Sequence, residues 1–144
     1  MSRVTAKEPM GLRDLDAKPK PARKQMRKRS AKRTAYMASD EGKQGLDHMG
    51  RVRQLPCCIC ENFGMIQNSP TEAHHCKSGR YSNLREHDRC TIPLCHSHHN
   101  KLRPYEGDES KVGYHNGQET WEALYGVDYH YIAGTLDAVD LLNE

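Results

Sequence analysis

The chain has 144 residues, of which 35% are hydrophobic and 6% aromatic, so it can form one small domain with a thin core and a tail. It contains no apolar run long enough to span a membrane and begins without an apolar signal segment, which predicts a cytoplasmic protein rather than a membrane or secreted one. The six Cys and nine His are candidate metal ligands, because in a reducing cytoplasm pairs of cysteines are expected to bind metal more often than to form disulfides.

Positive charge is concentrated near the amino terminus. Residues 1–40 carry 12 Lys and Arg against 4 Asp and Glu, a net charge of +8, and the rest of the chain has a net charge of −5. We predict that residues 1–38 are a disordered or nascent-helical DNA-binding arm before a folded domain at 39–144, although a solubilising tail or a localisation signal is the alternative. The basic residues expected to contact nucleic acid are Lys18, Lys20, Arg23, Lys24, Arg27, Lys28, Arg29, Lys32 and Arg33.

A helix is predicted at the start of the domain. Ser39 can cap it, and the two acidic residues that follow suit the positive end of the helix dipole. Its apolar side is expected to hold Leu46, Met49 and Val52, and it should end before Pro56.

Short elements are predicted between positions 57 and 102. Residues 57–59 and 71–75 are expected as short strands or knuckles on either side of a loop, because Gly, Asn and Pro interrupt the sequence between them. Pro93 can open a helical turn, and residues 95–102 are expected to form a short helix.

Two helices are predicted toward the carboxyl end. In "NGQETWEALYG", Asn116 and Glu119 have the spacing of a capping box, and Gly126 stands where a C-terminal glycine is favoured. Apolar residues at positions 132, 136 and 139 have helical spacing, which predicts a last helix packed on the domain.

Two matched ligand pairs predict a structural zinc site. Cys57-x-x-Cys60 and Cys95-x-x-His98 are separated by 34 residues, and two such knuckles complete a tetrahedron of zinc ligands. Buried free cysteines are the alternative, and Cys58 could replace Cys57, although the i, i+3 spacing favours Cys57. The cysteines at positions 76 and 90 are expected to be ordinary thiols.

His74 and His75 are adjacent and lie between the two knuckles. Neighbouring side chains of a strand point to opposite faces, so these imidazoles are expected to have different tasks. One can meet His99 at a second metal, and the other can act as a base beside it, because imidazole titrates near neutral pH. A divalent ion at that position would polarise a phosphate and neutralise the leaving oxygen.

The segments "CCIC", "AHH" and "PLCHSHH" together resemble the HNH nuclease motif in its zinc-ribbon version, over roughly residues 54–121. The resemblance implies an α+β fold, namely a small zinc-stapled ββα-metal domain with flanking helices. It makes His74 and His99 ligands of a catalytic metal, Mg²⁺ or another divalent ion, and His75 the general base.

The sequence departs from that motif at two positions. Asp88 is our substitute for the middle Asn, as a catalytic carboxylate beside the base or at the metal. Arg103 stands where many HNH helices carry a further ligand, so we expect His115 to replace it if residues 104–113 fold back; a surface histidine is the alternative. The histidines at positions 48, 87, 96 and 130 are expected in solvent, and the basic residues at positions 77, 80 and 103 are candidate phosphate contacts.

A closer similarity is to the phage Ref-type nucleases, through "HDRCTIPLCHSHHNKL", "YHNGQETWEALYG" and the basic arm. It implies a metal-dependent DNA endonuclease acting in recombination on RecA-coated DNA, located in the host cytoplasm if phage-encoded. A zinc-stapled DNA-binding module without catalysis, or an assembly protein of a phage or mobile element, are the alternatives. The four histidines at positions 74, 75, 99 and 115 distinguish the nuclease from the binding module, because a binding module has no need of a second metal site.

Overall fold

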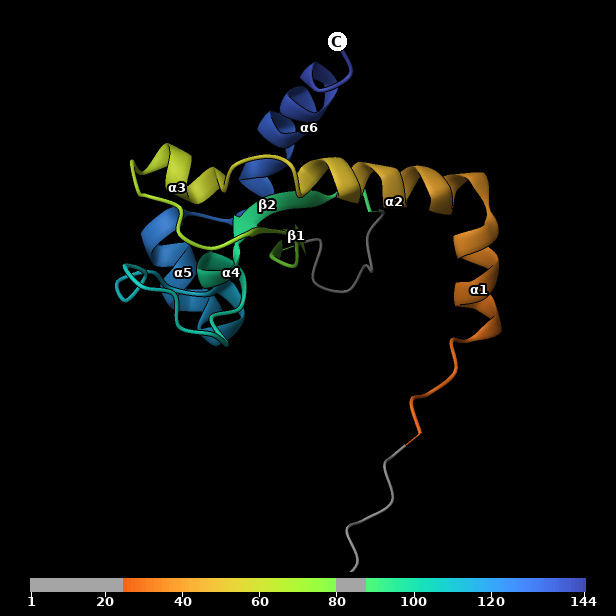
Figure 1. The fold of residues 1–144 in the computed structure, drawn as a ribbon, viewed down its shortest axis with the longest axis horizontal. Coiled ribbons are helices and arrows are strands. Elements are labelled where there is room, and N and C mark those ends of the chain that lie inside the picture. Colours follow the sequence, from red (N-terminus) through yellow and green to blue (C-terminus); the bar gives the residue numbers. More distant parts are fainter. Residues whose placement is uncertain (1–24, 80–87) are drawn as a thin grey trace, which may run out of the picture.

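A short antiparallel hairpin lies at the centre of the fold, with helices around it (Figure 1). The structure is a computed structural model and describes residues 25–79 and 88–144. In chain order its elements are α1 (Ala31–Ala38), α2 (Asp40–Val52), α3 (Cys58–Asn62), β1 (Thr71–His75), β2 (Thr91–Cys95), α4 (His96–His99), the 3-10 helix η2 (Tyr114–Asn116), α5 (Gln118–Tyr125), the 3-10 helix η3 (Asp128–Tyr131) and α6 (Ile132–Leu141).

The hairpin confirms one strand prediction and corrects another. β1 covers residues 71–75 as expected, and its partner β2 pairs Thr91 with His75 and Cys95 with Thr71. Pro93 lies in the middle of β2 opposite Ala73, so the helical turn expected there is wrong. Both strands are edges in a two-stranded sheet, where a residue without an N–H is tolerated.

The helices next to the hairpin also differ from expectation. Residues 58–62 form α3, so the strand alternative for residues 57–59 is wrong, and a knuckle leading into a helix is found instead. The helix expected at 95–102 is a single turn, α4. α4 follows β2 without a linker, so Cys95 ends the strand and directly precedes the helix.

α2 starts where the sequence predicts, and Met49 and Val52 are buried as expected, but Leu46 is not. The Ser39 hydroxyl accepts a hydrogen bond from the N–H of Gly42 at 3.1 Å, which confirms the cap. Leu46 is 39% exposed, whereas Gly42 and Gly45 are buried. A Cβ added at Gly45 would lie 2.5 Å from Oδ2 of Asp88, so glycine there permits an approach that a larger residue would block. The buried residues of α2 are Gly42, Gly45, His48, Met49 and Val52, which also corrects the expectation that His48 lies in solvent.

The core is small, as the composition predicts. The larger of two apolar clusters centres on fully buried Trp121, whose indole N–H donates to the carbonyl oxygen of His98 at 3.1 Å. The smaller cluster packs Val52 of α2 and Leu55 against Val139, so the last helix is confirmed and lies on the domain.

α5 ends as predicted but starts differently. Gly126 follows its last residue with φ of +84°, a left-handed conformation that favours glycine. Gly117 is the residue before its first turn, so the capping box is wrong. The Asn116 side chain instead accepts a hydrogen bond from the N–H of Lys101 at 2.9 Å, and so holds the chain near α4.

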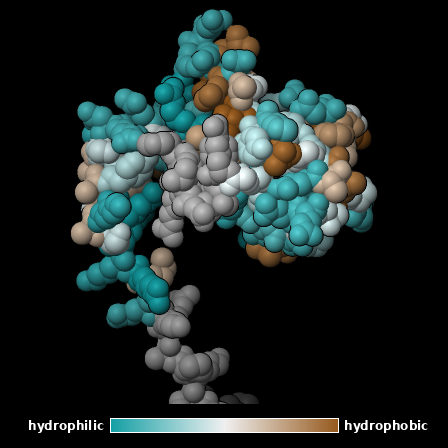
Figure 2. Space-filling model, turned by 180° about the vertical axis from the view of Figure 1, so that it is seen from behind, coloured by the Kyte–Doolittle hydropathy of each residue, from teal (hydrophilic) through white to brown (hydrophobic). Residues whose placement is uncertain are grey.

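The last eight residues of the predicted arm, 31–38, form α1, whose start is capped by the Ser30 hydroxyl. Figure 2 shows a hydrophilic surface where residues 25–30 lead into α1. Of the basic residues assigned to the arm, those at positions 27, 28, 29, 32 and 33 are exposed, and those at positions 18, 20, 23 and 24 lie outside the described residues. In the part of the chain that the structure describes, no helix is long and apolar enough to cross a bilayer.

Candidate metal centres

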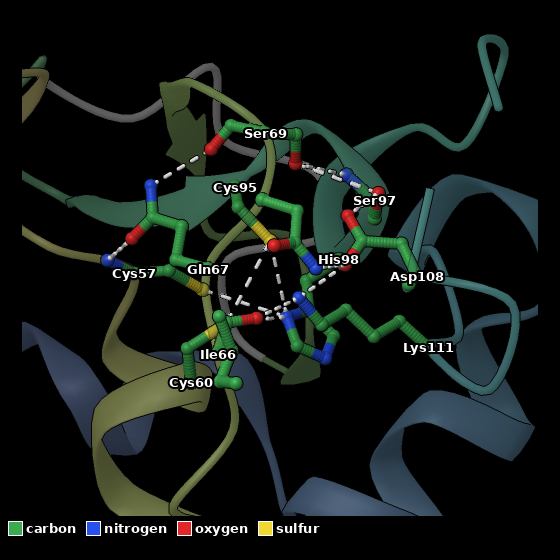
Figure 3. A network of polar contacts seen from close by, with 12 residues as sticks. Cys57, Cys60, Ile66, Gln67, Ser69, Cys95, Ser97, His98, Asp108 and Lys111 are labelled. Atoms are coloured by element: carbon green, nitrogen blue, oxygen red, sulfur yellow. Dashed lines mark hydrogen bonds and ion pairs between the residues drawn. The ribbon is translucent and has the colours of Figure 1, made fainter. Parts of the chain in front are cut away.

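The two predicted knuckles meet in a buried cluster of three cysteines and one histidine (Figure 3). The Nδ1 atom of His98 lies 3.5 Å from Sγ of Cys57, 3.6 Å from Sγ of Cys60 and 3.3 Å from Sγ of Cys95. The sulfurs of Cys60 and Cys95 are 3.9 Å apart. Zn–S bonds of about 2.3 Å in a tetrahedron place two sulfurs about 3.8 Å apart, so this buried cluster could bind zinc.

Cys58 lies outside this cluster. It is the first residue of α3, and its sulfur is not among the four ligand atoms that lie within 4.8 Å of one another. The geometry therefore favours Cys57 over Cys58 as a ligand. Among the described residues all six cysteines are free of disulfides, including Cys76 and Cys90.

The pKa values of the candidate ligand thiols are shifted in opposite directions. The hydrogen bond with Cys57 lowers the pKa of Cys95 to about 3, and a second hydrogen bond with His98 adds to this effect. The pKa of Cys57 is raised by its hydrogen bond with Cys95 and by burial. Cys95 is thus the preferred site of negative charge, as expected of a thiolate ligand.

A buried ion pair borders the cysteine cluster, and the sequence analysis missed it (Figure 3). Burial acts to lower the pKa of Lys111, but its hydrogen bond to Asp108 and the nearby Cys60 outweigh burial and raise it. The Asp108 carboxylate also accepts a hydrogen bond from the Ser97 hydroxyl at 2.6 Å. Ser97 precedes His98, so this pair ties the loop at 104–113 to the helix that carries the histidine ligands.

Three histidines form a second cluster, with ligand atoms within 4.8 Å of one another. His74 comes from β1, His99 from α4 and His115 from η2. The ring centroids of His99 and His115 are 5.0 Å apart, and those of His74 and His99 are 5.2 Å apart. The fold-back of residues 104–113 that this arrangement requires is therefore present.

His74 presents one ring nitrogen to this cluster. Its side chain is fully buried, and Nε2 donates to Oδ2 of Asp128 at 3.1 Å. Its buried Nδ1 has no hydrogen-bond partner among the described residues. Burial lowers the pKa of His74 to about 4, so the ring is neutral near pH 7 and has a lone pair on Nδ1. A neutral imidazole held by a carboxylate through its other nitrogen fits a metal ligand.

His99 is held by a second carboxylate, that of Glu72. Its Nδ1 donates to Oε2 of Glu72 at 2.6 Å, and Nδ1 of His96 donates to Oε1 at 2.9 Å. Burial acts to raise the pKa of Glu72, but these two hydrogen bonds outweigh it and lower the pKa. His96 is buried by this contact, so its expected solvent exposure is wrong.

Glu72 and Asp128 are the functional candidates that the sequence analysis missed. Glu72 precedes His74 by two residues in a strand and therefore lies on the same face, a signal that was available. Asp128 lies 54 residues beyond His74 in the chain, and no local pattern connects the two.

His75 is directed away from the three-histidine cluster and contacts Asp88. Its Nε2 donates to Oδ1 of Asp88 at 2.9 Å. The His75 side chain is 41% exposed and that of Asp88 only 6% exposed, so a buried carboxylate holds a histidine that solvent can reach. Asp88 thus lies beside the predicted base rather than within the three-histidine cluster.

The remaining predicted contacts lie on the surface or outside the described residues. Lys77, Arg103 and His130 are exposed, the last as expected. Positions 80 and 87 fall in the segment 80–87, outside the described residues.

The chain matches the model of a protein family described as recombination enhancement, RecA-dependent nuclease, over residues 42–139. The matched segment contains both metal-ligand clusters, together with His75 and Asp88. No curated protein and no solved structure matches the chain.

Proposed function

Because the chain belongs to the family of RecA-dependent nucleases of recombination enhancement, we propose that it is a metal-dependent DNA endonuclease of the HNH type. Its proposed substrate is DNA coated by a RecA filament. The observation that carries the proposal is the arrangement on β1, where His74 joins a three-histidine cluster and His75, on the other face, is held by Asp88. A DNA-binding module without catalysis would need the cysteine cluster and the basic arm, but neither the three-histidine cluster nor the contact between His75 and Asp88.

The order of elements supports the HNH assignment. Two antiparallel strands lead directly into α4, with His74 on the first strand and His99 on the helix. This is the strand, strand, helix order of the ββα-metal motif. The cysteine cluster contains residues of the same unit, because Cys95 ends β2 and His98 lies in α4.

His74, His99 and His115 would hold the catalytic metal. When bound, a divalent ion there would polarise the scissile phosphate and neutralise charge on the leaving oxygen. Three imidazole ligands suit Zn²⁺, Ni²⁺ and similar ions better than Mg²⁺, which prefers oxygen ligands. Asp128 and Glu72 fix the orientation of two of the rings by accepting their second N–H groups.

His75 would act as the general base. Because the hydrogen on Nε2 points to Asp88, Nδ1 is the nitrogen that can accept a proton from water. The exposed ring can meet a substrate, and the buried carboxylate stabilises the imidazolium that forms.

The direct test is nicking of a supercoiled plasmid with Mg²⁺, Mn²⁺, Ni²⁺ or Zn²⁺, with and without a RecA filament. We expect cleavage that requires one of these ions and increases with the filament. Protein that retains zinc in its cysteine cluster and binds DNA, but leaves it intact with every ion, would establish the non-catalytic DNA-binding module instead.

Deleting residues 1–29 should weaken DNA binding and flatten its dependence on salt, because the deletion removes ten Lys and Arg and only three acidic residues. Each lost phosphate contact reduces the slope of log K against log salt by about 0.9 for duplex DNA. The deletion keeps Ser30, which caps α1. The measurement is DNA affinity across a salt series.

The matched control deletes residues 1–17, which contain three basic and three acidic residues and so leave the net charge unchanged. An equal loss of affinity in both deletions, or an unchanged slope in the longer one, would show that the charge of the arm does not act on DNA.

Replacing Asp128 by asparagine should weaken metal binding at the three-histidine cluster about 10–100-fold, because the partner that orients His74 is lost. Asp137→Asn, on the exposed surface of α6, is the matched control. Calorimetric titration with Ni²⁺ of protein that carries one zinc ion per chain, in its cysteine cluster, measures the difference. Equal affinities in the two variants would mean that Asp128 has only a structural role.

A further inference from the structure

Asp88 joins His75 to α1, the helix that ends the basic arm. Oδ1 of Asp88 accepts the hydrogen bond from His75 at 2.9 Å, and Oδ2 accepts a hydrogen bond from the Tyr36 hydroxyl at 3.1 Å. Both carboxylate oxygens therefore have partners, one from the hairpin and one from α1. The three residues are far apart in the chain, so only the fold connects them.

The junction between α1 and α2 is shaped for this contact. A Cβ at Gly42 would lie 1.9 Å from the carbonyl oxygen of Tyr36, and a Cβ at Gly45 would lie 2.5 Å from Oδ2 of Asp88. Glycine at one position lets the end of α1 approach α2, and glycine at the other leaves room for the carboxylate. In Figure 1, α1 meets the end of α2 that lies away from α3.

Tyr36 is also the first residue of α1 whose side chain is partly shielded from solvent by the domain. Residues 31–35 are exposed, whereas Tyr36 is half-buried. The guanidinium of Arg33, one of the residues expected to contact DNA, lies 5.6 Å from the centre of the Tyr36 ring. α1 therefore has a basic side facing solvent and a tyrosine facing Asp88.

We propose that Tyr36 is a positioning residue for DNA cleavage, holding Asp88 so that His75 keeps the orientation needed to accept a proton from water. The inference rests on the proposed nuclease function. It makes the end of the arm part of the catalytic apparatus as well as part of the DNA-binding surface. Without the Tyr36 hydroxyl, Oδ2 of Asp88 loses the hydrogen bond that ties it to α1, and the carboxylate can rotate away from His75.

The test compares steady-state kinetics of DNA cleavage for Tyr36→Phe, Gly45→Ala and Gly50→Ala. Tyr36→Phe removes one hydroxyl and should lower kcat about 10-fold, the effect of a lost hydrogen bond to a charged group, with KM unchanged. Gly45→Ala should lower kcat as well, because its Cβ displaces Asp88. Gly50→Ala is the matched control in the same helix and should cleave at the parental rate, since apart from its chain neighbours and the backbone of its own helix no described atom lies within 4 Å of the added Cβ.

Coupling to Asp88 separates a positioning role from a merely structural one. In an Asp88→Asn background, adding Tyr36→Phe should change kcat less than twofold, because the group on which the hydroxyl acts is already altered. A kcat equal to that of the parent in Tyr36→Phe, or effects of the two substitutions that simply multiply, would overturn the inference and leave the nuclease function standing. A parent protein that fails to cleave DNA would overturn both.

Discussion

The His75→Ala variant is expected to cleave DNA about 10²–10⁴-fold more slowly than the parent, the usual effect of losing a general base. The variant should still bind metal, because the three-histidine cluster lies on the other face of β1 and contains no atom of His75. It should also bind DNA with parental affinity, because the exposed basic residues of the arm are unchanged. The measurements are single-turnover nicking rates and DNA affinity.

His99→Ala is the comparison that separates a base from a ligand. It removes one of three metal ligands, so part of its lost activity should return as the metal concentration is raised. Raising the metal should not rescue His75→Ala. If raised metal rescued His75→Ala but not His99→Ala, His75 would be the ligand and His99 the base. His130→Ala, at an exposed histidine outside both clusters, is the matched control and should cleave normally.

The Cys60→Ala variant is expected to lose zinc and to be unfolded or aggregated. Structural zinc in small domains contributes about 10–16 kcal/mol at neutral pH. This is comparable to the whole stability of about 5–15 kcal/mol that is typical of a folded domain. The cysteine cluster links α3, β2 and α4, and its three cysteines are themselves part of the larger apolar cluster of a small core. Zinc content by metal analysis and folding by circular dichroism measure the effect.

Cys58→Ala is the matched control for that variant, because it removes a buried cysteine two residues away that lies outside the cluster. It should retain one zinc ion per chain and remain folded. A folded Cys60→Ala protein without zinc, or loss of zinc in Cys58→Ala instead, would show that the ligands are assigned wrongly.

The sequence predicts the ligand clusters better than it predicts the fold around them. Ligand spacing is local chemistry, so Cys57, Cys60, Cys95 and His98 were found from two knuckles, and the structure brings them together. β2 was missed because Pro93 is a poor strand residue, which is tolerated here because β2 is an edge strand.

Long-range contacts explain the other features that the sequence analysis did not predict. Asp128 reaches His74 across 54 residues, and the Lys111–Asp108 pair follows from the way one loop returns to α4, so neither leaves a local pattern. Met49 and Val52 are buried in α2 as predicted, but Leu46 is not, because hydrophobic spacing does not reveal that a carboxylate packs against Gly45.

His98 and His99 are consecutive residues of one helical turn, and each belongs to a different cluster. With zinc in the cysteine cluster as proposed, a cell short of zinc would therefore make a chain whose α4 is not fixed, and His99 would have no defined place opposite His74. The third histidine, His115, is also the last of these ligands to be synthesised. Under the proposed mechanism, a nascent chain on the ribosome would thus be unable to cut the DNA of the cell that makes it until both the metal supply and the full ligand set are in place.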